Sequence, residues 1–411
     1  MQQQFINANY EIVNFNEYAD IYVINTCTVT SISDKKSRQM IRKAKQINNK
    51  SLVIAVGCYA QVGKDELEKI EELDLILGNN EKKDIIKHIK NLKETRIHVK
   101  EMLKDEKFIE FGSVTYIEKT RAVIKVQDGC DKFCSYCIIP YARGKVRSRK
   151  PESVVEEIED LAQIGIKEVV ITGIHIASYG KDLKDNIFLI DLLEKIDQIN
   201  GIERIRLGSL EPTIINEEFI KRLSKLNKVC HHFHLSLQSG NNETLKRMNR
   251  RYTTEDFEKA VALLRKEYKD VMLTTDIIVG FPGETEEEFN STYEFLKKIK
   301  FYKMHIFKYS KREGTKAATM QNQVNSKIQE KRSRKLIELS DFNQLEYNKQ
   351  HINKEVEVLF EEQNGNIVKG HSQNYILVEC KNDKEVNLHN LIKKVTIQQA
   401  LGSGIIGKII M

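Results

Sequence analysis

Short apolar runs alternate with amphipathic stretches over the first part of the chain. Three of the runs are typical of buried parallel strands: IYVINT (21–26), LVIAVG (52–57) and LDLILG (73–78). Helical spacing of apolar positions follows each run, at about 33–47, near 64–71 and from about 81. This order predicts a parallel sheet with helices on its faces. Residues 94–118 are charged and aperiodic, which indicates a linker.

A second alternating region extends to about residue 320. Its predicted strands are RAVIKVQ (121–127), EVVITG (168–173), RIRLGS (204–209), HHFHLSLQ (231–238), LTTDIIVG (273–280) and MHIFKYS (304–310). Helical patterns separate them at 151–164, 186–199, 216–226, 254–268 and 285–299. Consecutive βα units of this kind predict a partial or full parallel barrel. In such barrels the reactive groups gather at the carboxyl ends of the strands.

The pattern changes again after residue 320. A charged helical segment is predicted over 324–350, and short β-rich runs separated by turn residues follow it: EVEVLFEE, NIVKGHSQ, YILVEC, KEVNL, KVTIQQA and GIIGKII. These runs favour a small β-barrel of about 60 residues. We therefore expect three domains, over 1–112 with its linker, 113–345 and 346–411.

Composition narrows the class of protein. Among 411 residues, 40% are apolar and 30% are charged, which is typical of a soluble globular protein. No run approaches the roughly 18 apolar residues of a membrane helix, and MQQQFINANYEIVNF has no signal-peptide pattern, so a cytoplasmic location is expected. A net charge of +7 is compatible with an RNA partner, but a solvated lysine-rich surface would give the same value.

Cysteine spacing gives the strongest chemical signal. Of the seven cysteines, Cys130, Cys134 and Cys137 lie in GCDKFCSYCIIPYARG (129–144), directly after a predicted barrel strand. Three thiolates this close can hold three irons of a [4Fe–4S] cluster and leave the fourth iron open to an amino-carboxylate ligand. A zinc knuckle is the alternative, but it takes four ligands, and no fourth Cys or His lies nearby.

The C-x3-C-x2-C motif in this position resembles that of the radical S-adenosylmethionine superfamily. The longer string GCDKFCSYCIIPYARGKVRSR resembles the methylthiotransferase branch of that superfamily. Further strings agree along nearly the whole chain: INTCTVT (24–30), DKKSRQ (34–39), GCYAQ (57–61), TGIHIASYG (172–180), LGSLEP (207–212), HLSLQSGN (234–241) and DIIVGFPGET (276–285). The resemblance implies an α/β protein with a flavodoxin-like N-terminal domain, a partial (β/α)6 barrel and a C-terminal TRAM-like RNA-binding β-barrel.

Cys27 and Cys58 form a second candidate set. Each follows an apolar strand directly, so both are expected at the carboxyl edge of the N-terminal sheet, where ligands bind. Each residue alone is equally compatible with a small buried hydrophobe. The resemblance implies that they hold an auxiliary iron–sulfur cluster that delivers sulfur.

The family holds that auxiliary cluster with three cysteines, and the first lies upstream of the segment where this sequence begins. Residues 1–7 resemble the helix that follows the missing motif, so we expect a truncated N-terminal domain. Cys230 and Cys380 are expected to pack as ordinary thiols rather than to replace the missing ligand. The alternatives are a truncated chain and a protein that does not assemble the normal auxiliary cluster.

The resemblance also implies the cofactor contacts. It places them at Tyr136 in the cysteine loop, at Thr172, Gly173, Ser209, Glu211, Gln238 and Ser239 at strand ends, at Gly280 and Gly283 near adenine, and at Arg250 for the methionine carboxylate. Turn, surface and solvated roles are the alternatives for these residues. His175 and His234 are expected to be structural rather than ligands.

Among the methylthiotransferases, VINTCTVT, DKKSRQ and TGIHIASYG resemble the enzymes that act on N6-threonylcarbamoyladenosine in tRNA. The implied reaction adds a methylthio group to carbon 2 of adenosine 37 and uses S-adenosylmethionine and [4Fe–4S] clusters. The implied partners are a tRNA anticodon stem-loop, an electron donor such as flavodoxin or ferredoxin, and a sulfur source. KRSRK (331–335) is the best candidate for phosphate contacts. The alternatives are a non-catalytic tRNA-binding protein and a radical enzyme with a different target.

Overall fold

The structure is a computed structural model of the chain, and it describes residues 1–92, 96–102, 107–110, 120–184, 186–383 and 386–410. Contacts divide the chain into two compact units. The first unit contains Met1–Tyr116, Asp128–Ser148 and Ser310–Thr319, and the second unit contains Ile117–Gln127, Arg149–Tyr309 and Met320–Met411. The three-domain division expected from the sequence stays a prediction.

A four-stranded parallel sheet forms the centre of the first unit. Its strands are β1 (Ile21–Thr26), β2 (Leu52–Gly57), β3 (Leu75–Leu77) and β4 (Ile97–His98), in that order across the sheet. The three predicted strands are confirmed. The fourth strand lies in the stretch predicted as a linker, because two residues are too few to show a periodicity. Much of the remaining predicted linker lies outside the described residues.

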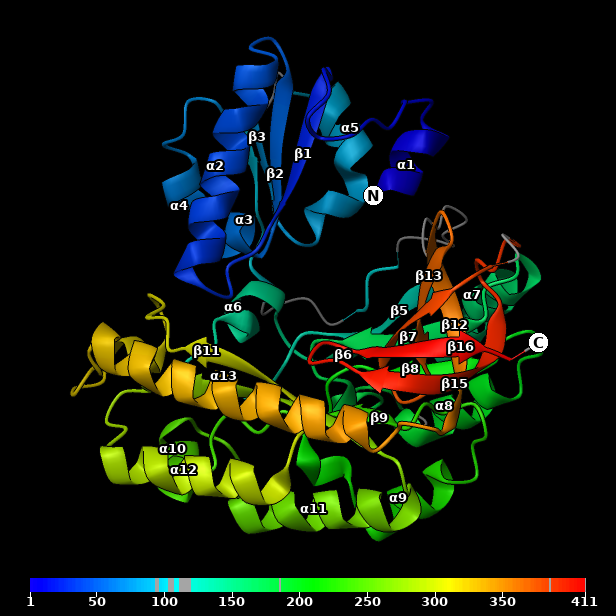
Figure 1. The fold of residues 1–411 in the computed structure, drawn as a ribbon. Helices are drawn as coiled ribbons and strands as arrows, with labels where there is room; N and C mark the ends of the chain where they lie inside the picture. Colours follow the sequence, from blue (N-terminus) through cyan, green and yellow to red (C-terminus); the bar gives the residue numbers. More distant parts are fainter. Residues whose placement is uncertain (93–95, 103–106, 111–119, 185, 384–385, 411) are drawn as a thin grey trace. The chain divides into compact units, whose positions relative to one another are not determined.

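Helices cover both faces of this sheet, as Figure 1 shows. They are α1 (Gln2–Asn7), α2 (Ser31–Ile47), α3 (Cys58–Val62), α4 (Lys64–Leu67) and α5 (Ile85–Lys90), with a further short helix α6 (Ile139–Arg143) and strand β6 (Arg147–Ser148) in the unit. Ile41 and Ala44 of α2 pack on one face, and Phe5 of α1 and Ile85 of α5 pack on the other. Burial on both faces explains why the strands are continuously apolar. The helix predicted near 64–71 is present as the shorter α4, whereas α3, which Gly63 separates from it, was not predicted.

Six parallel strands form the half-barrel of the second unit: β5 (Arg121–Asp128), β7 (Glu168–Gly173), β8 (Arg204–Leu207), β9 (His232–His234), β10 (Met272–Val279) and β11 (Lys303–Lys308). Parallel pairing joins β5 to β7 to β8, and β9 to β10 to β11. Isolated bridges from Ile205 to Val229 and from Leu210 to Leu235 connect the two sheets. The predicted six-stranded barrel is therefore confirmed, although β9 is shorter than the predicted 231–238.

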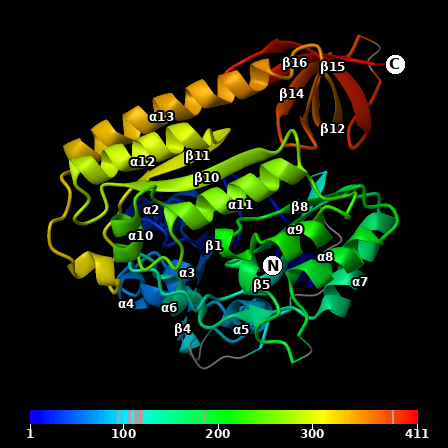
Figure 2. The same ribbon diagram turned by 90° about the horizontal axis from the view of Figure 1, so that it is seen from below.

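The half-barrel helices are α7 (Pro151–Gln163), α8 (Leu189–Asp197), α9 (Glu217–Leu223), α10 (Asn242–Arg247), α11 (Thr254–Glu267) and α12 (Glu286–Ile299). In Figure 2, α11 and α12 lie alongside β10 and β11. Capping boxes start both helices, at Thr253 with Asp256 and at Thr285 with Glu288. Helix α10 was not predicted, because six residues are too few to show a helical period.

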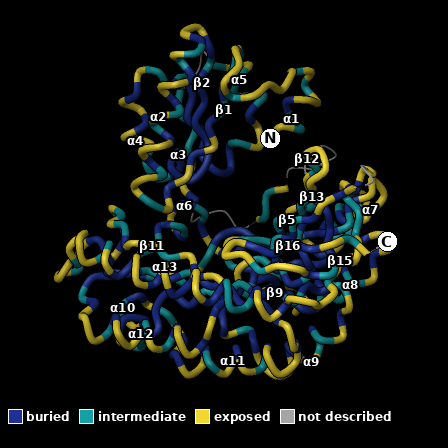
Figure 3. The backbone as a smooth tube through the Cα atoms, in the orientation of Figure 1, coloured by how far each residue is buried: buried dark blue, intermediate teal, exposed yellow. Residues whose placement is uncertain are grey.

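Side chains alternate between the two faces of the half-barrel strands. Residues such as Val169, Ile205 and Ile277 join the apolar core under the helices, which is the buried interior in Figure 3. Many of the intervening residues, which face the opposite, concave side, are polar: Glu168, Arg204, Arg206, His232, His234 and Asp276. The concave face of the half-barrel is therefore polar and charged.

Helix α13 (Ser326–Lys349) leads to a closed barrel of five strands: β12 (Glu355–Asn364), β13 (Ile367–Ser372), β14 (Leu377–Lys381), β15 (Ile392–Ala400) and β16 (Ile405–Ile409). The predicted helix and small barrel are confirmed. The run KEVNL (384–388) is no strand in its described part, 386–388. Cys380 is buried in this barrel and Cys230 in the half-barrel, and burial raises the pKa of their thiols to about 12 and about 11. Both fit the expected packing role.

The C-terminal barrel is fastened to the half-barrel by polar contacts. Arg204 donates to the backbone oxygens of His371 and Glu357, both at 2.9 Å. The ring of Tyr375 lies 4.4 Å from the guanidinium of Arg206, which is itself paired with Glu168 at 2.7 Å. Cation–π contacts and charge-assisted hydrogen bonds are strongest when desolvated, as they are here.

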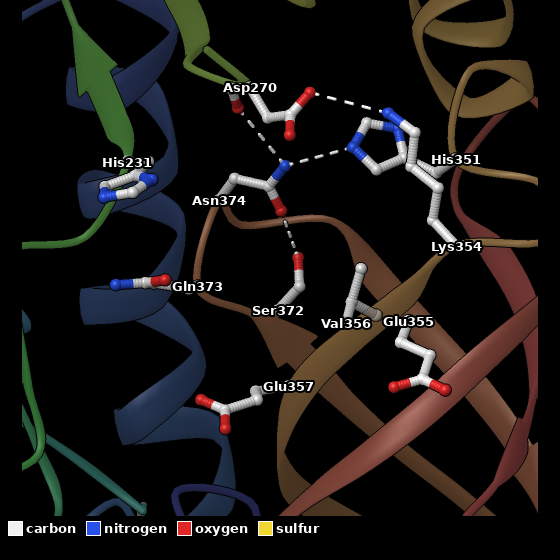
Figure 4. Close-up of a pocket in the computed structure, with 10 residues that line it drawn as sticks. All are labelled: His231, Asp270, His351, Lys354, Glu355, Val356, Glu357, Ser372, Gln373 and Asn374. Carbon is white, nitrogen blue, oxygen red and sulfur yellow. Dashed lines mark hydrogen bonds and ion pairs between the residues drawn. The ribbon is translucent and has the colours of Figure 1, made fainter. Parts of the chain in front are cut away.

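A cavity of about 290 Å³ lies beside this joint (Figure 4). Asn374 donates to the backbone oxygen of Asp270 at 3.4 Å and contacts His351 Nε2 at 3.3 Å. Lys354 pairs with Asp270 at 3.6 Å, and Ser372 donates to Asn374 Oδ1 at 2.6 Å. These contacts link the end of α13, the half-barrel and the C-terminal barrel.

Candidate active site

The three clustered cysteines lie in a loop of the first unit. Cys130, Cys134 and Cys137 are all half-buried. The backbone N–H of Cys137 donates to the carbonyl of Cys134 at 2.9 Å, which forms a turn around Tyr136. Half-buried thiols on one tight loop can reach a shared cofactor while solvent is partly excluded. This donor set fits a [4Fe–4S] cluster.

Two residues of this loop, Phe133 and Gly129, have left-handed backbone conformations. Phe133, between the first two cysteines, has a φ of +49°, a conformation that is costly for a bulky residue. Gly129 has a φ of +72°, and a Cβ there would lie 1.7 Å from the backbone oxygen of Lys145. The N–H of Cys130 donates to the carbonyl of Gly144 at 3.0 Å. Glycine at position 129 therefore permits the close approach that positions Cys130.

Cys27 and Cys58 share the carboxyl edge of the N-terminal sheet. Thr26 and Gly57 are register partners at the ends of β1 and β2, so the two cysteines are the next residue on each strand. Cys27 is exposed and Cys58 is buried. The predicted placement at one sheet edge is confirmed by this register, whereas their role as iron ligands stays a prediction.

Two side chains that the sequence did not single out donate to Cys58. Arg143 Nε lies 3.1 Å from its sulfur, and Asn79 Nδ2 lies 3.8 Å from it. Burial lowers the pKa of Arg143, but Cys58 and Asp128 outweigh this effect and raise the pKa above its usual value. The guanidinium and the amide are both directed at one sulfur and hold the Cys58 side chain in place at the sheet edge.

Arg143 connects the two cysteine sets within the first unit. It lies at the end of α6, six residues after Cys137, and its donor reaches the sulfur of the auxiliary candidate Cys58. Asn79 also donates to the carbonyl of Ala142 on the same helix, at 2.8 Å. Asn79 follows β3 at the same sheet edge as the cysteines, so its position after a strand was a usable signal in the sequence. The contact of Arg143 had no such signal.

A cavity of about 770 Å³ lies in the first unit next to both cysteine sets. Its lining includes the residues that follow the cysteines, namely Thr28, Tyr59 and Ile138. Tyr141, which is 46% exposed, and Arg38 supply an aromatic face and a cation. Arg312 pairs with Asp34 and donates to Thr28 in the wall of this cavity. The cavity is large enough for a nucleotide-sized ligand.

The predicted cofactor residues of the half-barrel lie mostly at strand ends of the second unit. Thr172 and Gly173 end β7, and a Cβ on Gly173 would lie 2.8 Å from the backbone oxygen of Gln127. Ser209, which is exposed, and Glu211, which is buried, follow β8. His175 Nε2 contacts Glu211 Oε2 at 2.7 Å and thereby ties the loops after β7 and β8 together. The pairing of His175 with Glu211 was not foreseen.

The loop after β9 contains the next two predicted contacts. Gln238 has a φ of +72°, and its N–H donates to the carbonyl of Asp276 at 2.9 Å. Strain of this kind at a non-glycine residue is typical of functional sites. Ser239 is 1% exposed, and its hydroxyl lies 3.2 Å from that of Thr292. In this structure the Ser239 side chain fastens the loop to α12.

The remaining predicted contacts lie on loops around the barrel mouth. Gly280 and Gly283 have φ values of +68° and +79°, which suit a backbone in close approach to a ligand. Arg250 donates to the hydroxyl of Tyr252 at 2.9 Å and to the backbone oxygen of Ser236 at 3.3 Å. The carboxylate contact of Arg250 stays a prediction, as do the other cofactor contacts.

Comparison with known proteins identifies the class. Residues 124–296 match the Radical SAM superfamily, and residues 1–78 match Uncharacterized protein family UPF0004. Two structures of the radical S-adenosylmethionine methyltransferase TsrM from Kitasatospora setae share the fold, with TM-scores of 0.57 and 0.55 at 18% sequence identity. The first match covers 74% of this chain and 67% of the TsrM chain, and the second covers 71% and 63%. The chain is thus a radical S-adenosylmethionine protein, a class whose members use that cofactor and [4Fe–4S] clusters.

Curated relatives define the family. The chain is 41% identical to the threonylcarbamoyladenosine tRNA methylthiotransferase MtaB of Bacillus subtilis, over 93% of this chain and 87% of the relative. It is 42% identical to the protein of the same name from Aquifex aeolicus, over 94% and 93%. Identity to a tRNA-2-methylthio-N(6)-dimethylallyladenosine synthase of Caldicellulosiruptor saccharolyticus is 38%, over 89% and 79%. The chain belongs to the radical S-adenosylmethionine methylthiotransferase family.

Among the described residues, no helix combines the length and the apolar character that crossing a membrane requires.

Proposed function

We propose that this protein is a tRNA methylthiotransferase that converts N6-threonylcarbamoyladenosine at position 37 to its 2-methylthio derivative. The observation that carries the proposal is 41–42% identity, over nearly the whole chain, to two enzymes named for that substrate. Identity is 38% to an enzyme of the dimethylallyladenosine branch and 37% to a third threonylcarbamoyladenosine enzyme, that of Thermotoga maritima. Nothing in the comparisons favours a non-catalytic tRNA-binding protein.

The cysteine sets supply the ligands for this chemistry. Cys130, Cys134 and Cys137 would hold the cluster that gives the electron for cleavage of S-adenosylmethionine. Cys27 and Cys58 would hold the auxiliary cluster, with Arg143 and Asn79 directed at the Cys58 sulfur.

Binding of the cofactor is assigned to the strand ends of the half-barrel. Glycine at positions 173 and 280 lets Gln127 and Gln329 pack closely against these strand ends, and Glu211 is held in place by His175. These residues orient the reacting atoms, and orientation alone accounts for a large part of such rate enhancements.

The substrate base has to leave its stack to reach a protein cavity. An unpaired anticodon-loop purine costs least to extrude. The cavity of about 770 Å³ offers Tyr141 for stacking. Arg38 also lines it, and its guanidinium bonds the Tyr59 hydroxyl at 2.6 Å and pairs with Glu66 at 3.6 Å. This cavity supports a nucleotide substrate over a small metabolite.

Phosphate contacts are assigned to the exposed side of α13. Lys331, Arg334 and Lys335 are exposed there, whereas Arg332 is buried and paired with Glu284 at 2.6 Å. Three of the four cations of KRSRK are therefore available to a tRNA backbone, and their contribution would weaken with salt. The C-terminal barrel is assigned a TRAM-like role in the same interaction.

Further partners follow from the chemistry. Reduction of the cluster requires an electron donor such as flavodoxin or ferredoxin, and methylthiolation requires a sulfur source. A tRNA substrate and these partners support a cytoplasmic location.

The test is an anaerobic methylthiolation assay with the reconstituted chain and three tRNAs: one with threonylcarbamoyladenosine, one with dimethylallyladenosine and one with unmodified adenosine at position 37. Nucleosides are then separated and weighed by mass spectrometry. We expect a methylthio product only from the first, and none from a C130A variant. Product from the dimethylallyl tRNA alone would assign the chain to the other branch. Formation of 5′-deoxyadenosine without any methylthio product would contradict the proposal.

A further inference from the structure

Three potential metal ligands meet on the concave face of the half-barrel. They are His234 at the end of β9, Asp276 in β10 and His305 in β11, and one ligand atom of each lies within 4.8 Å of the other two. Two imidazoles and one carboxylate form a set that divalent transition metals prefer. None of these residues was assigned to the cofactor or the clusters. The sequence alone had favoured a structural role for His234.

Strand register fixes the arrangement. Asp276 and His305 are direct partners across β10 and β11, and His234 is the partner of Thr274, two residues before Asp276. Residues two apart on a strand point to the same face, so all three side chains project from one side of the sheet. Sites built on strands hold their geometry better than sites on loops.

The pair His234 and Asp276 already has a ligand-like separation. Nε2 of His234 lies 3.2 Å from Oδ2 of Asp276. A metal with bonds of about 2.1 Å separates neighbouring ligands by about 3.0–3.4 Å, for angles between 90° and 109°. The ligand atom of the exposed His305 lies within 4.8 Å of both, so its distance to each has to shorten by at most about 1.8 Å to complete this geometry.

Hydrogen bonding prepares His234 for such a role. Its Nδ1 lies 3.0 Å from the hydroxyl of Thr274, which fixes the ring, while its buried Nε2 faces Asp276 without forming a hydrogen bond of proper geometry. Metal-bound histidines characteristically use their second nitrogen in this way. A buried nitrogen without a hydrogen bond otherwise costs free energy.

We propose that His234, Asp276 and His305 form a binding site for one divalent transition-metal ion, with zinc as the probe. Three protein ligands leave further coordination positions open toward the concave face. The site is adjacent to the strand ends assigned to the cofactor, because the N–H of Gln238, one of the predicted cofactor contacts, donates to the carbonyl of Asp276. Zinc binding is measured without RNA, so its outcome is independent of the methylthiotransfer proposed above.

The experiment compares zinc content in the anaerobically reconstituted full chain after equilibrium dialysis. The variants are D276N and H305Q, and the control is H389Q, an exposed histidine of the C-terminal barrel. All four proteins have the same cysteines, so zinc bound to sulfur cancels. We expect one zinc fewer per chain in D276N and H305Q than in the wild type and H389Q. H305D, which puts a carboxylate oxygen in place of the imidazole nitrogen, should restore binding.

Two further readouts separate a metal site from a polar cluster. X-ray absorption at the zinc edge should show nitrogen and oxygen neighbours at about 2.0–2.2 Å rather than sulfur at about 2.3 Å for the zinc that the variants lose. T274V keeps all three ligands but removes the support of His234, and should weaken zinc binding about 10–100-fold. Equal zinc content in all proteins, or loss of sulfur-bound zinc only, would overturn the proposal and leave a hydrogen-bonding cluster.

Discussion

The substitution G129A tests whether Gly129 positions Cys130 in the cysteine loop. It combines two effects, the cost of a left-handed backbone at a residue other than glycine and the clash of the new Cβ with the chain. Gly129 has a φ of +72°, and its new Cβ would lie 1.7 Å from the carbonyl oxygen of Lys145. Carbon and oxygen normally approach to about 3.3 Å, so the loop has to open by about 1.6 Å. That movement breaks the bond from Cys130 N–H to the carbonyl of Gly144.

The matched control is G165A. Gly165 has a φ of +90°, but no atom lies within 4 Å of the position that a Cβ would take there, so alanine meets only the left-handed backbone. That conformation costs about 1–2 kcal/mol. In G129A the lost buried hydrogen bond adds about 1–3 kcal/mol, for a total of about 2–5 kcal/mol.

Two measurements test this difference. Chemical denaturation gives the stability, and iron content with 5′-deoxyadenosine formation after anaerobic reconstitution reports on the cluster. We expect G165A to retain wild-type iron and cofactor cleavage, and G129A to lose most of both because Cys130 is displaced. If G129A and G165A hold equal iron and cleave the cofactor equally, the turn does not position Cys130 and the reasoning fails.

Three other substitutions give distinct outcomes. R143Q removes a charge-assisted hydrogen bond to Cys58 that is worth about 1.5–3 kcal/mol. Iron at the proposed auxiliary site should therefore bind about 10–100-fold more weakly in a chelator competition, with R143K as the control. Superimposable competition curves for R143Q and the wild type would contradict this prediction. R332A leaves Glu284 buried without its partner and should lower the free energy of unfolding by about 3–5 kcal/mol. R334A, on the exposed side of the helix, should change it by less than about 0.5 kcal/mol. Similar denaturation midpoints for the two variants would show that the buried pair does not stabilise the fold. Burial holds the pKa of His232 well below its usual value, so below about pH 6.5 the unfolded chain binds a proton that the folded chain does not. Stability should therefore fall as the pH drops through about 6.5, and H232Q should flatten that dependence of the melting temperature; an unchanged slope would exclude His232 as its source.

Much of the architecture was accessible from the sequence because parallel strands buried on both faces are short and continuously apolar. The runs at 21–26 and 52–57 coincide with β1 and β2. The run at 168–173 coincides with β7 of the half-barrel, where only one face joins the apolar core. The strand β4 and the helix α10 were not predicted, because elements of two and six residues are too short to show a periodic pattern of apolar positions. Close spacing in the chain likewise revealed the three loop cysteines.

Contacts between distant segments were not accessible in the same way. Arg143 and Cys58 are 85 positions apart, and only the packing of α6 brings them to 3.1 Å. The cluster of His234, Asp276 and His305 depends on which residues of three strands fall in register. The basic run KRSRK showed charge but not orientation, and the structure buries Arg332 within it.

The joint between the half-barrel and the C-terminal barrel has a consequence for protein synthesis. Arg204 bonds carbonyl oxygens of Glu357 and His371, which are 153 and 167 positions later in the chain. A nascent half-barrel on the ribosome therefore holds guanidinium groups whose acceptors have not yet been made, and such an intermediate is prone to misassemble. Removal of the whole C-terminal barrel, which includes Glu357 in β12 and His371 in β13, would make this transient state permanent. The C-terminal barrel thus completes the folding of the half-barrel that precedes it.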